Sequence, residues 1–106
     1  MIQETVEKFL SNKKNHILKG TKKKHVPGWQ KMGIDPDDPN AWTMVIPVLD
    51  EVLKKGRFEG VTLEENGFIT SYALDFIKEG VTVVVKVFHS FDGAISRISD
   101  AIPYVN

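Results

Sequence analysis

Two hydrophobic periods divide the chain at Gly56. Before it, apolar residues recur every three or four positions; after it, they alternate or run together in short β-branched stretches. The first spacing predicts amphipathic helices, and the second predicts strands. The pattern therefore predicts an α+β domain, with N-terminal helices followed by a four-stranded antiparallel β-sheet and a long helix packed on one face.

Helices are expected in three places. Residues 2–10 place four apolar side chains on one helical face: Ile2, Val6, Phe9 and Leu10. "HILK" at 16–19 predicts a turn or two ending at Gly20. Residues 21–36 lack a helical period and are expected to be irregular. The main helix is expected over about residues 38–55.

The main helix carries one apolar stripe and clear end signals. The stripe consists of Trp42, Val45, Ile46, Leu49, Val52 and Leu53. Asp38 is expected to cap the helix, with Pro39 in its first turn and Gly56 at its exit. Because Pro47 falls inside the stripe, we expect it to kink the helix or to move its start later.

Four strands are expected over about residues 57–102. "NG" at 66–67 predicts a hairpin turn between the first two. "VTVVVKVF" at 81–88 is nearly all apolar and β-branched, which favours a central strand. "AISRIS" at 94–99 predicts the last strand, and Pro103 is expected to end its pairing because proline has no N–H.

Size and composition favour a single domain over residues 1–106. The chain has no cysteine, which excludes disulfides, thiolate zinc sites and thiol catalysis. It has no apolar run near eighteen residues, so no membrane anchor is expected. The opening "MIQETVEKFL" also lacks the pattern of a secretory signal.

The net charge is zero, but the charges are segregated. Residues 1–31, the basic helical arm, hold eight lysines against two glutamates, a net of +6. Residues 32–106 hold six basic against twelve acidic side chains, a net of −6. The arm suits an anionic ligand such as a nucleic-acid backbone, and the acidic body could dock a basic partner.

The richest stretch for chemistry is "KNHILKGTKKKHVPGW" at 14–29. It contains two histidines, five lysines, one tryptophan and no carboxylate. RNA cleavage by its own 2′-hydroxyl needs a base, an acid and a cation for the phosphate. His16 and His25 could supply the proton transfers, and Lys19, three residues after His16, could supply the cation. The alternative is that both histidines are exposed loop residues in a solvated basic segment.

The same stretch holds candidate RNA contacts. Lys22, Lys23 and Lys24 could contact phosphates, or they could simply form a solvated loop. Trp29 could stack on a base or fill the core. His89, at a turn, is expected to be structural. "DPDDPN" at 35–40 is better explained by helix capping than by calcium binding, because it lacks the glycine and distal glutamate of an EF-hand loop.

Short motifs at both ends resemble a known toxin family. "NHILKG" at 15–20 is similar to the H-I-L-x-G segment that opens bacterial EndoU-type toxin domains, and "FDGAISRISDAIPYV" at 91–105 is similar to their last strand. "HIL…KHxxxW" followed by a "DPxxW" helix also resembles C-terminal domains of polymorphic and contact-dependent growth inhibition (CdiA-type) toxins. Many of these have the barnase–EndoU–colicin–RelE fold.

The resemblance implies roles for individual residues. His16 matches the first family histidine, and His25 is the best match to the second, although "GTKKKH" is not the usual glycine-rich context. The hydroxyl residue of the terminal motif falls at Asp100, with Ser99 beside it. Either Ser99 takes that role or the chain belongs to a sister family with different active-site chemistry. Tyr104 lies where the family often has an aromatic residue.

The implied function is a metal-independent endoribonuclease toxin without a cofactor. It would cleave a structured RNA such as tRNA, leaving a 2′,3′-cyclic phosphate and a 5′-hydroxyl. The implied setting is a larger secreted bacterial toxin that acts in the cytoplasm of a target cell. An immunity protein would bind it, plugging the basic cleft with acidic groups, and a host activating factor could be required.

Three alternatives remain open. The first is a non-catalytic RNA-binding module that uses the same basic arm. The second is an immunity or adaptor protein that binds its partner through the acidic sheet. The third is a metal-dependent DNA nuclease, against which the scattered acidic residues argue.

Overall fold

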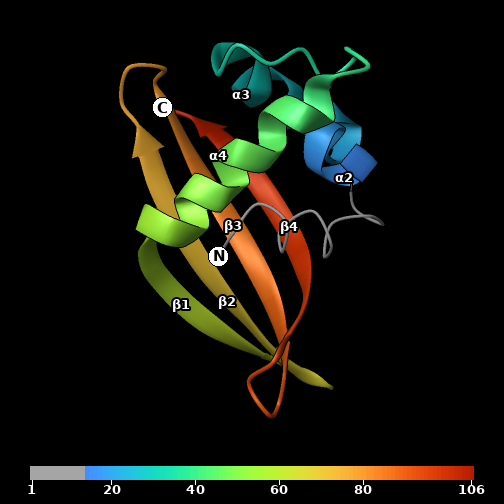
Figure 1. Cartoon of the computed structure of the whole chain (residues 1–106), viewed down its shortest axis with the longest axis vertical. Helices are drawn as coiled ribbons and strands as arrows, with labels where there is room; N and C mark the ends of the chain where they lie inside the picture. The colour runs from blue at the N-terminus through green and yellow to red at the C-terminus, as the bar shows by residue number, and fades with distance from the viewer. Residues whose placement is uncertain (1–13) are drawn as a thin grey trace.

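The computed structural model describes residues 14–106, and the helix expected over residues 2–10 lies outside them. The described chain is an α+β domain, as predicted, with its helices before its strands (Figure 1). Its elements are α2 (Lys14–Lys19), the 3₁₀ helix η1 (Thr21–Lys23), α3 (Val26–Lys31), α4 (Ala41–Lys55), β1 (Arg57–Glu64), β2 (Gly67–Phe76), β3 (Val81–Ser90) and β4 (Ile95–Val105).

The strands form an antiparallel meander in the order β1-β2-β3-β4. Val85 at the centre of β3 pairs with Tyr72 on one side and Ala101 on the other, so β3 is a central strand, as predicted. The first hairpin loop consists of Glu65 and Asn66, because Glu64 already pairs with Gly67. The expected turn at 66–67 was therefore one position late.

The last strand continues beyond its expected end. β4 runs to Val105, and Pro103 pairs with Val83 instead of ending the ladder. β4 is an edge strand, where a residue without an N–H can be accommodated when that position faces away from the neighbouring strand. This extension brings the C-terminal end of β4 beside the N-terminal helices.

The long helix differs from prediction at its start. α4 begins at Ala41, and Asp38 does not cap it, because its Oδ1 instead accepts the Asn40 N–H at 2.8 Å. Such Asx turns are typical of aspartate in loops. Pro47 lies within the helix, which continues to Lys55 as one element.

The segment expected to be irregular is partly helical. α3 forms there, with Pro27 at the second position, where a missing N–H has no helical partner to lose. Its Trp29 joins the buried core with α4 and β3. The core consists of Ile17, Trp29, Ile34, Ala41, Val45, Ile46, Leu49, Val52, Val81, Val83, Val85, Val87, Ile98 and Ala101.

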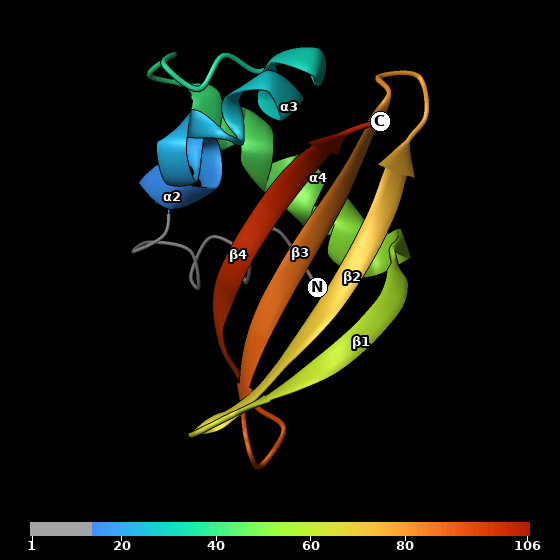
Figure 2. The same ribbon diagram turned by 180° about the vertical axis from the view of Figure 1, so that it is seen from behind.

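One face of the sheet is covered by α4, which contacts β2 and β3 (Figure 1). From behind, no helix of the described residues covers the other face (Figure 2). In both views α2 and α3 lie at one end of the molecule, beside the C-terminal part of β4. Within residues 14–106, no helix has the length and apolar character needed to cross a membrane.

Candidate active site

The helical end of the domain and the last strand enclose a cleft of about 740 Å³. One wall comes from α2, η1 and α3, and the other comes from the C-terminal half of β4. The lining residues are His16, Thr21, Lys24, His25, Pro27, Asp100, Ile102, Pro103, Tyr104 and Val105. The structure thus brings the two candidate histidines together with Asp100, although His25 and Asp100 are 75 positions apart in the sequence.

A close approach of α3 to β4 fixes the position of the cleft. A β-carbon at Gly28 would collide with the carbonyl oxygen of Pro103 and would lie 2.7 Å from its Cβ and Cγ. Because glycine has no side chain, the backbone of α3 can lie directly against β4. His25, which immediately precedes α3, is thereby held beside this strand.

His25 is held by hydrogen bonding and by packing. Its Nδ1 lies 2.9 Å from the carbonyl oxygen of Ile17, and its exposed fraction is only 7%. A carbonyl can only accept, so Nδ1 carries the hydrogen and Nε2 holds the lone pair of the neutral ring. A β-carbon at Gly20 would lie 2.6 Å from Cδ2 and 2.9 Å from Nε2 of this ring. Gly20, with φ of 71° and ψ of −179°, therefore leaves space for this edge of the imidazole.

His16 lies beside His25 and faces a carboxylate. The two ring centroids are 5.7 Å apart, with the planes inclined at 70°. Nε2 of His16 is 3.4 Å from Oδ1 of Asp100, and that oxygen also accepts the Ala101 N–H at 2.8 Å. Asp100 is thus oriented by the backbone of β4 and can accept a hydrogen bond from His16.

A bulge in β4 distinguishes Asp100 from Ser99. Lys86 pairs with Asp100 and Val87 with Ile98, so Ser99 is the extra residue. Ser99 lies in a separate recess with Arg97 and Phe88, while Asp100 lines the histidine cleft. Of the two residues considered for the terminal motif, only Asp100 is placed to act with the histidines.

The base-stacking role considered for Trp29 is not supported. Trp29 is completely buried, and its Nε1–H donates to the Ile17 carbonyl oxygen at 2.8 Å. Its ring faces are therefore unavailable to a base. Ile17 accepts hydrogen bonds from both Trp29 and His25, so the indole helps to position the backbone that holds the histidine.

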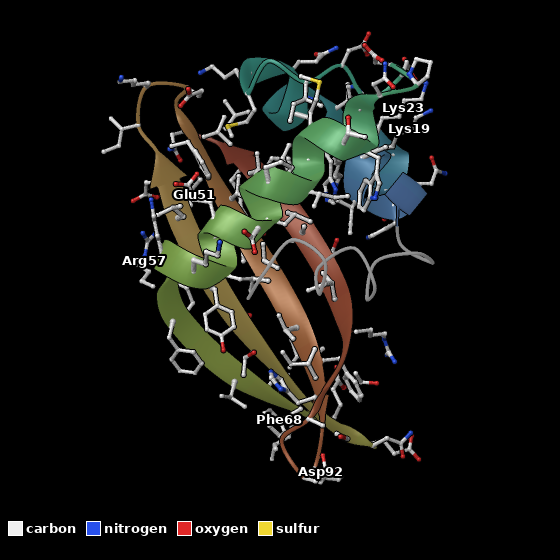
Figure 3. The ribbon with its side chains drawn as sticks, in the orientation of Figure 1. Lys19, Lys23, Glu51, Arg57, Phe68 and Asp92 are labelled. Carbon is white, nitrogen blue, oxygen red and sulfur yellow. The ribbon has the colours of Figure 1, made fainter. Side chains whose placement is uncertain are left out.

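The expected catalytic cation is also placed elsewhere. Nζ of Lys19 lies 3.2 Å from Oδ1 of Asp37, and Lys19 does not line the cleft. Lys24 lines it instead. Lys22 and Lys23 are exposed in η1, with left-handed φ values of 54° and 60°. Lys19 and Lys23 lie at the helical end of the molecule, far from Arg57 (Figure 3).

The remaining lining residues give the cleft an apolar wall with one aromatic ring. Tyr104 is half exposed, while Pro27, Ile102 and Val105 add apolar surface. Thr21 adds a hydroxyl group. Of these residues, only Tyr104 was expected from the sequence, because single apolar residues and a lone threonine carry no chemical signature until tertiary contacts place them together.

His89 lies outside the cleft and has structural partners. Its Nδ1–H donates to the Gly93 carbonyl oxygen at 3.2 Å, and its Nε2 lies 2.9 Å from Thr70 Oγ1. Phe68 stacks on its ring at 4.8 Å. Within residues 14–106, no three His, Asp or Glu side chains form a group suited to holding a metal ion.

Three surface groups away from the cleft have displaced pKa values. Hydrogen bonds from Thr82 and Arg57 lower the pKa of Asp75, and Asp75 in turn raises the pKa of Arg57. The Ser90 hydroxyl and the Ala94 N–H lower the pKa of Asp92. The interactions of Asp75 join side chains of β1, β2 and β3, and those of Asp92 hold the turn between β3 and β4.

Comparison of the chain with protein-family models, with curated proteins and with solved structures found no match in any of the three. The catalytic activity proposed for the chain therefore depends on the geometry of the cleft.

Proposed function

We propose that the chain is a metal-independent endoribonuclease that cleaves RNA by attack of the 2′-hydroxyl on the adjacent phosphate. The observation that carries the proposal is the pairing of His16 and His25, 5.7 Å apart between ring centroids, in a cleft that also contains Asp100 and Lys24. Two imidazoles that line one cleft can supply a base and an acid to a phosphodiester bound there.

The hydrogen bonds suggest a role for each histidine. His25 donates through Nδ1, so its Nε2 lone pair suits the base that removes the 2′-hydroxyl proton. A protonated His16 can donate through Nε2 to Asp100 and deliver its Nδ1 proton to the leaving 5′-oxygen. O2′ then bonds to phosphorus as the P–O5′ bond breaks, which gives a 2′,3′-cyclic phosphate and a 5′-hydroxyl.

The rest of the cleft suits an RNA strand. Lys24 can stabilise negative charge on the phosphate, a role that the sequence had suggested for Lys19. Lys22 and Lys23 are exposed nearby and can contact flanking phosphates. Tyr104 replaces Trp29 as the candidate stacking platform, because its ring is half exposed in the cleft wall.

The biological setting follows from the resemblance of "NHILKG" and "FDGAISRISDAIPYV" to EndoU-type toxin domains. We propose a toxin domain of a larger secreted bacterial protein that cleaves a structured RNA, such as tRNA, in a target cell. An acidic immunity protein that covers the cleft would be its natural inhibitor. A host activating factor is an additional candidate partner.

A non-catalytic RNA-binding module is the second candidate. The burial of His25, at 7% exposed, favours it, because a catalytic base must reach the substrate. The two functions differ in one outcome, because the binding module would retain RNA without cutting it. The affinity of the binding module for RNA would fall as the salt concentration rises.

The test is incubation of purified chain with total bacterial RNA in EDTA, beside the variants His16→Ala and His25→Ala. His89→Ala is the matched control, because His89 lies outside the cleft. We expect discrete fragments from the wild type and the control, and a loss of about 10²–10⁴-fold in each cleft variant. Intact RNA that still binds the wild-type chain would favour the binding module. Equal cleavage by all four proteins would exclude this cleft as the active site.

A further inference from the structure

Within residues 14–106, β1 forms the edge of the sheet on the side opposite the cleft. Among the described strands, β1 pairs only with β2, and its sequence RFEGVTLE contains no lysine or proline, two residues that commonly protect edge strands. Three of its apolar side chains are largely exposed, at 57% for Phe58, 55% for Val61 and 78% for Leu63. The opposite edge strand, β4, contacts α2 and α3 and contains Pro103.

The register of β1 places its apolar and charged side chains on different faces. Phe58, Val61 and Leu63 pair with Tyr72, Thr70 and Phe68, which lie on the face covered by α4. Phe58 packs edge-on against Tyr72 at 5.8 Å. Arg57, Gly60, Thr62 and Glu64 alternate with them on the other face, and the bulge between Phe58 and Gly60 makes Glu59 the extra residue.

This arrangement makes β1 complementary to itself. We propose that β1 pairs antiparallel with β1 of a second copy, about a two-fold axis at Val61. Val61 then lies opposite Val61 of the partner and Thr62 lies opposite Gly60. Because Glu59 is an extra residue, the next pairs are Leu63 with Phe58 and Glu64 with Arg57. By symmetry, each of these unlike pairs forms twice.

On each face of the proposed junction, the side chains of the two copies that meet are complementary. Exposed apolar side chains meet on the face that carries α4, so pairing removes them from water. Opposite charges meet on the other face, and cross-strand pairs of opposite charge stabilise antiparallel sheets. The result is a continuous eight-stranded sheet. Its two histidine clefts lie at the outer β4 edges, so both remain accessible to a large substrate.

A cysteine at the axis gives the sharpest test, because the natural chain has none. In an antiparallel pair, a residue on the two-fold axis faces its own copy at a Cα separation of about 4.5–5.5 Å, which a disulfide can span. Val61→Cys is therefore expected to form a disulfide-linked dimer rapidly under mild oxidation. Ile77→Cys is the matched control, because Ile77 is 86% exposed but lies in the turn after β2.

Light scattering after size-exclusion chromatography should give the wild-type chain twice its 11.9 kDa monomer mass. Disulfide formation by Val61→Cys should be at least tenfold faster than by Ile77→Cys. A wild-type chain that is monomeric up to millimolar concentration would overturn the proposal. Crosslinking of Ile77→Cys at the same rate as Val61→Cys would also overturn it.

A charge exchange tests the register. Glu64→Arg places one arginine opposite Arg57 of the other copy at each of the two symmetric positions, and it is expected to raise the dimer dissociation constant about tenfold. Adding Arg57→Glu to the same chain restores opposite charges across the axis and should recover most of the affinity. Thermal unfolding checks that both variants remain folded, which matters most for the double variant because Arg57 pairs with Asp75 and Glu59 within its own chain. A double variant as weak as Glu64→Arg would overturn the proposed register.

Discussion

Gly20→Ala should damage the proposed active site much more than it damages the fold. Gly20 has φ of 71° and ψ of −179°, a conformation that is nearly restricted to glycine. Forcing alanine into it costs on the order of 1–3 kcal/mol. At about 5 °C per kcal/mol for a domain of this size, the melting temperature should fall by roughly 5–15 °C.

The added methyl group also collides with His25. Its carbon would lie 2.6 Å from Cδ2 and 2.7 Å from Cγ of the imidazole. Ordinary carbon contacts lie at about 3.5–4.0 Å, so the ring or the turn must move by roughly 1 Å. A displacement of this size at a catalytic group can cost about 10²-fold in rate. We therefore expect RNA cleavage to fall by about that factor.

Gly33→Ala separates the two effects. Gly33 also has a left-handed φ, 81°, but a β-carbon there would have no neighbour within 4 Å. Urea unfolding followed by tryptophan fluorescence should show a loss of stability in both variants. RNA cleavage, measured where both are fully folded, should fall only in Gly20→Ala. Equal cleavage by both variants would refute the argument that Gly20 positions a catalytic His25.

Three further predictions concern the cleft, a turn and the core. Lys24→Ala should weaken RNA binding and reduce the slope of log affinity against log salt by about 1, measured by fluorescence anisotropy. Ser90→Ala should raise the pKa of Asp92 toward its ordinary 3.8, measured by NMR titration. Because the folded pKa is depressed, Asp92 stabilises the fold above pH 3.8, and this contribution is lost as the pH falls through the folded pKa. Leu49→Ala should cost about 2–5 kcal/mol in urea unfolding, because Leu49 is fully buried on the face of α4 that packs in the core.

Local sequence signals were sufficient for most of the sheet and the long helix. The period of two and the turn residues predicted four strands, and the apolar stripe through Leu49 predicted α4. α3 was missed because "VPGWQK" is too short to display a helical period. The extension of β4 was missed because proline normally interrupts pairing, and only its place on an edge strand allows Pro103 to lie within the ladder.

The candidate site was predictable in its residue types but not in its arrangement. His16 and His25 were identified from their chemistry, and the structure places them together with Asp100. Lys19 and Trp29 were assigned by proximity in sequence. Nothing local indicated that Asp37 would pair with Lys19, or that the Ile17 carbonyl would hold the Trp29 indole in the core. Such contacts depend on how α2, α3 and β4 come together.

The most direct test of the two-histidine mechanism is the chemistry of the cleaved ends. RNA digested by the purified chain in EDTA should carry 2′,3′-cyclic phosphates and 5′-hydroxyls, and a 2′-deoxynucleotide at the mapped site should block cleavage there. The His16→Ala/His25→Ala double variant is expected to leave the RNA uncut. Products ending in 3′-hydroxyls and 5′-phosphates, or cleavage that persists at the 2′-deoxynucleotide, would contradict the mechanism.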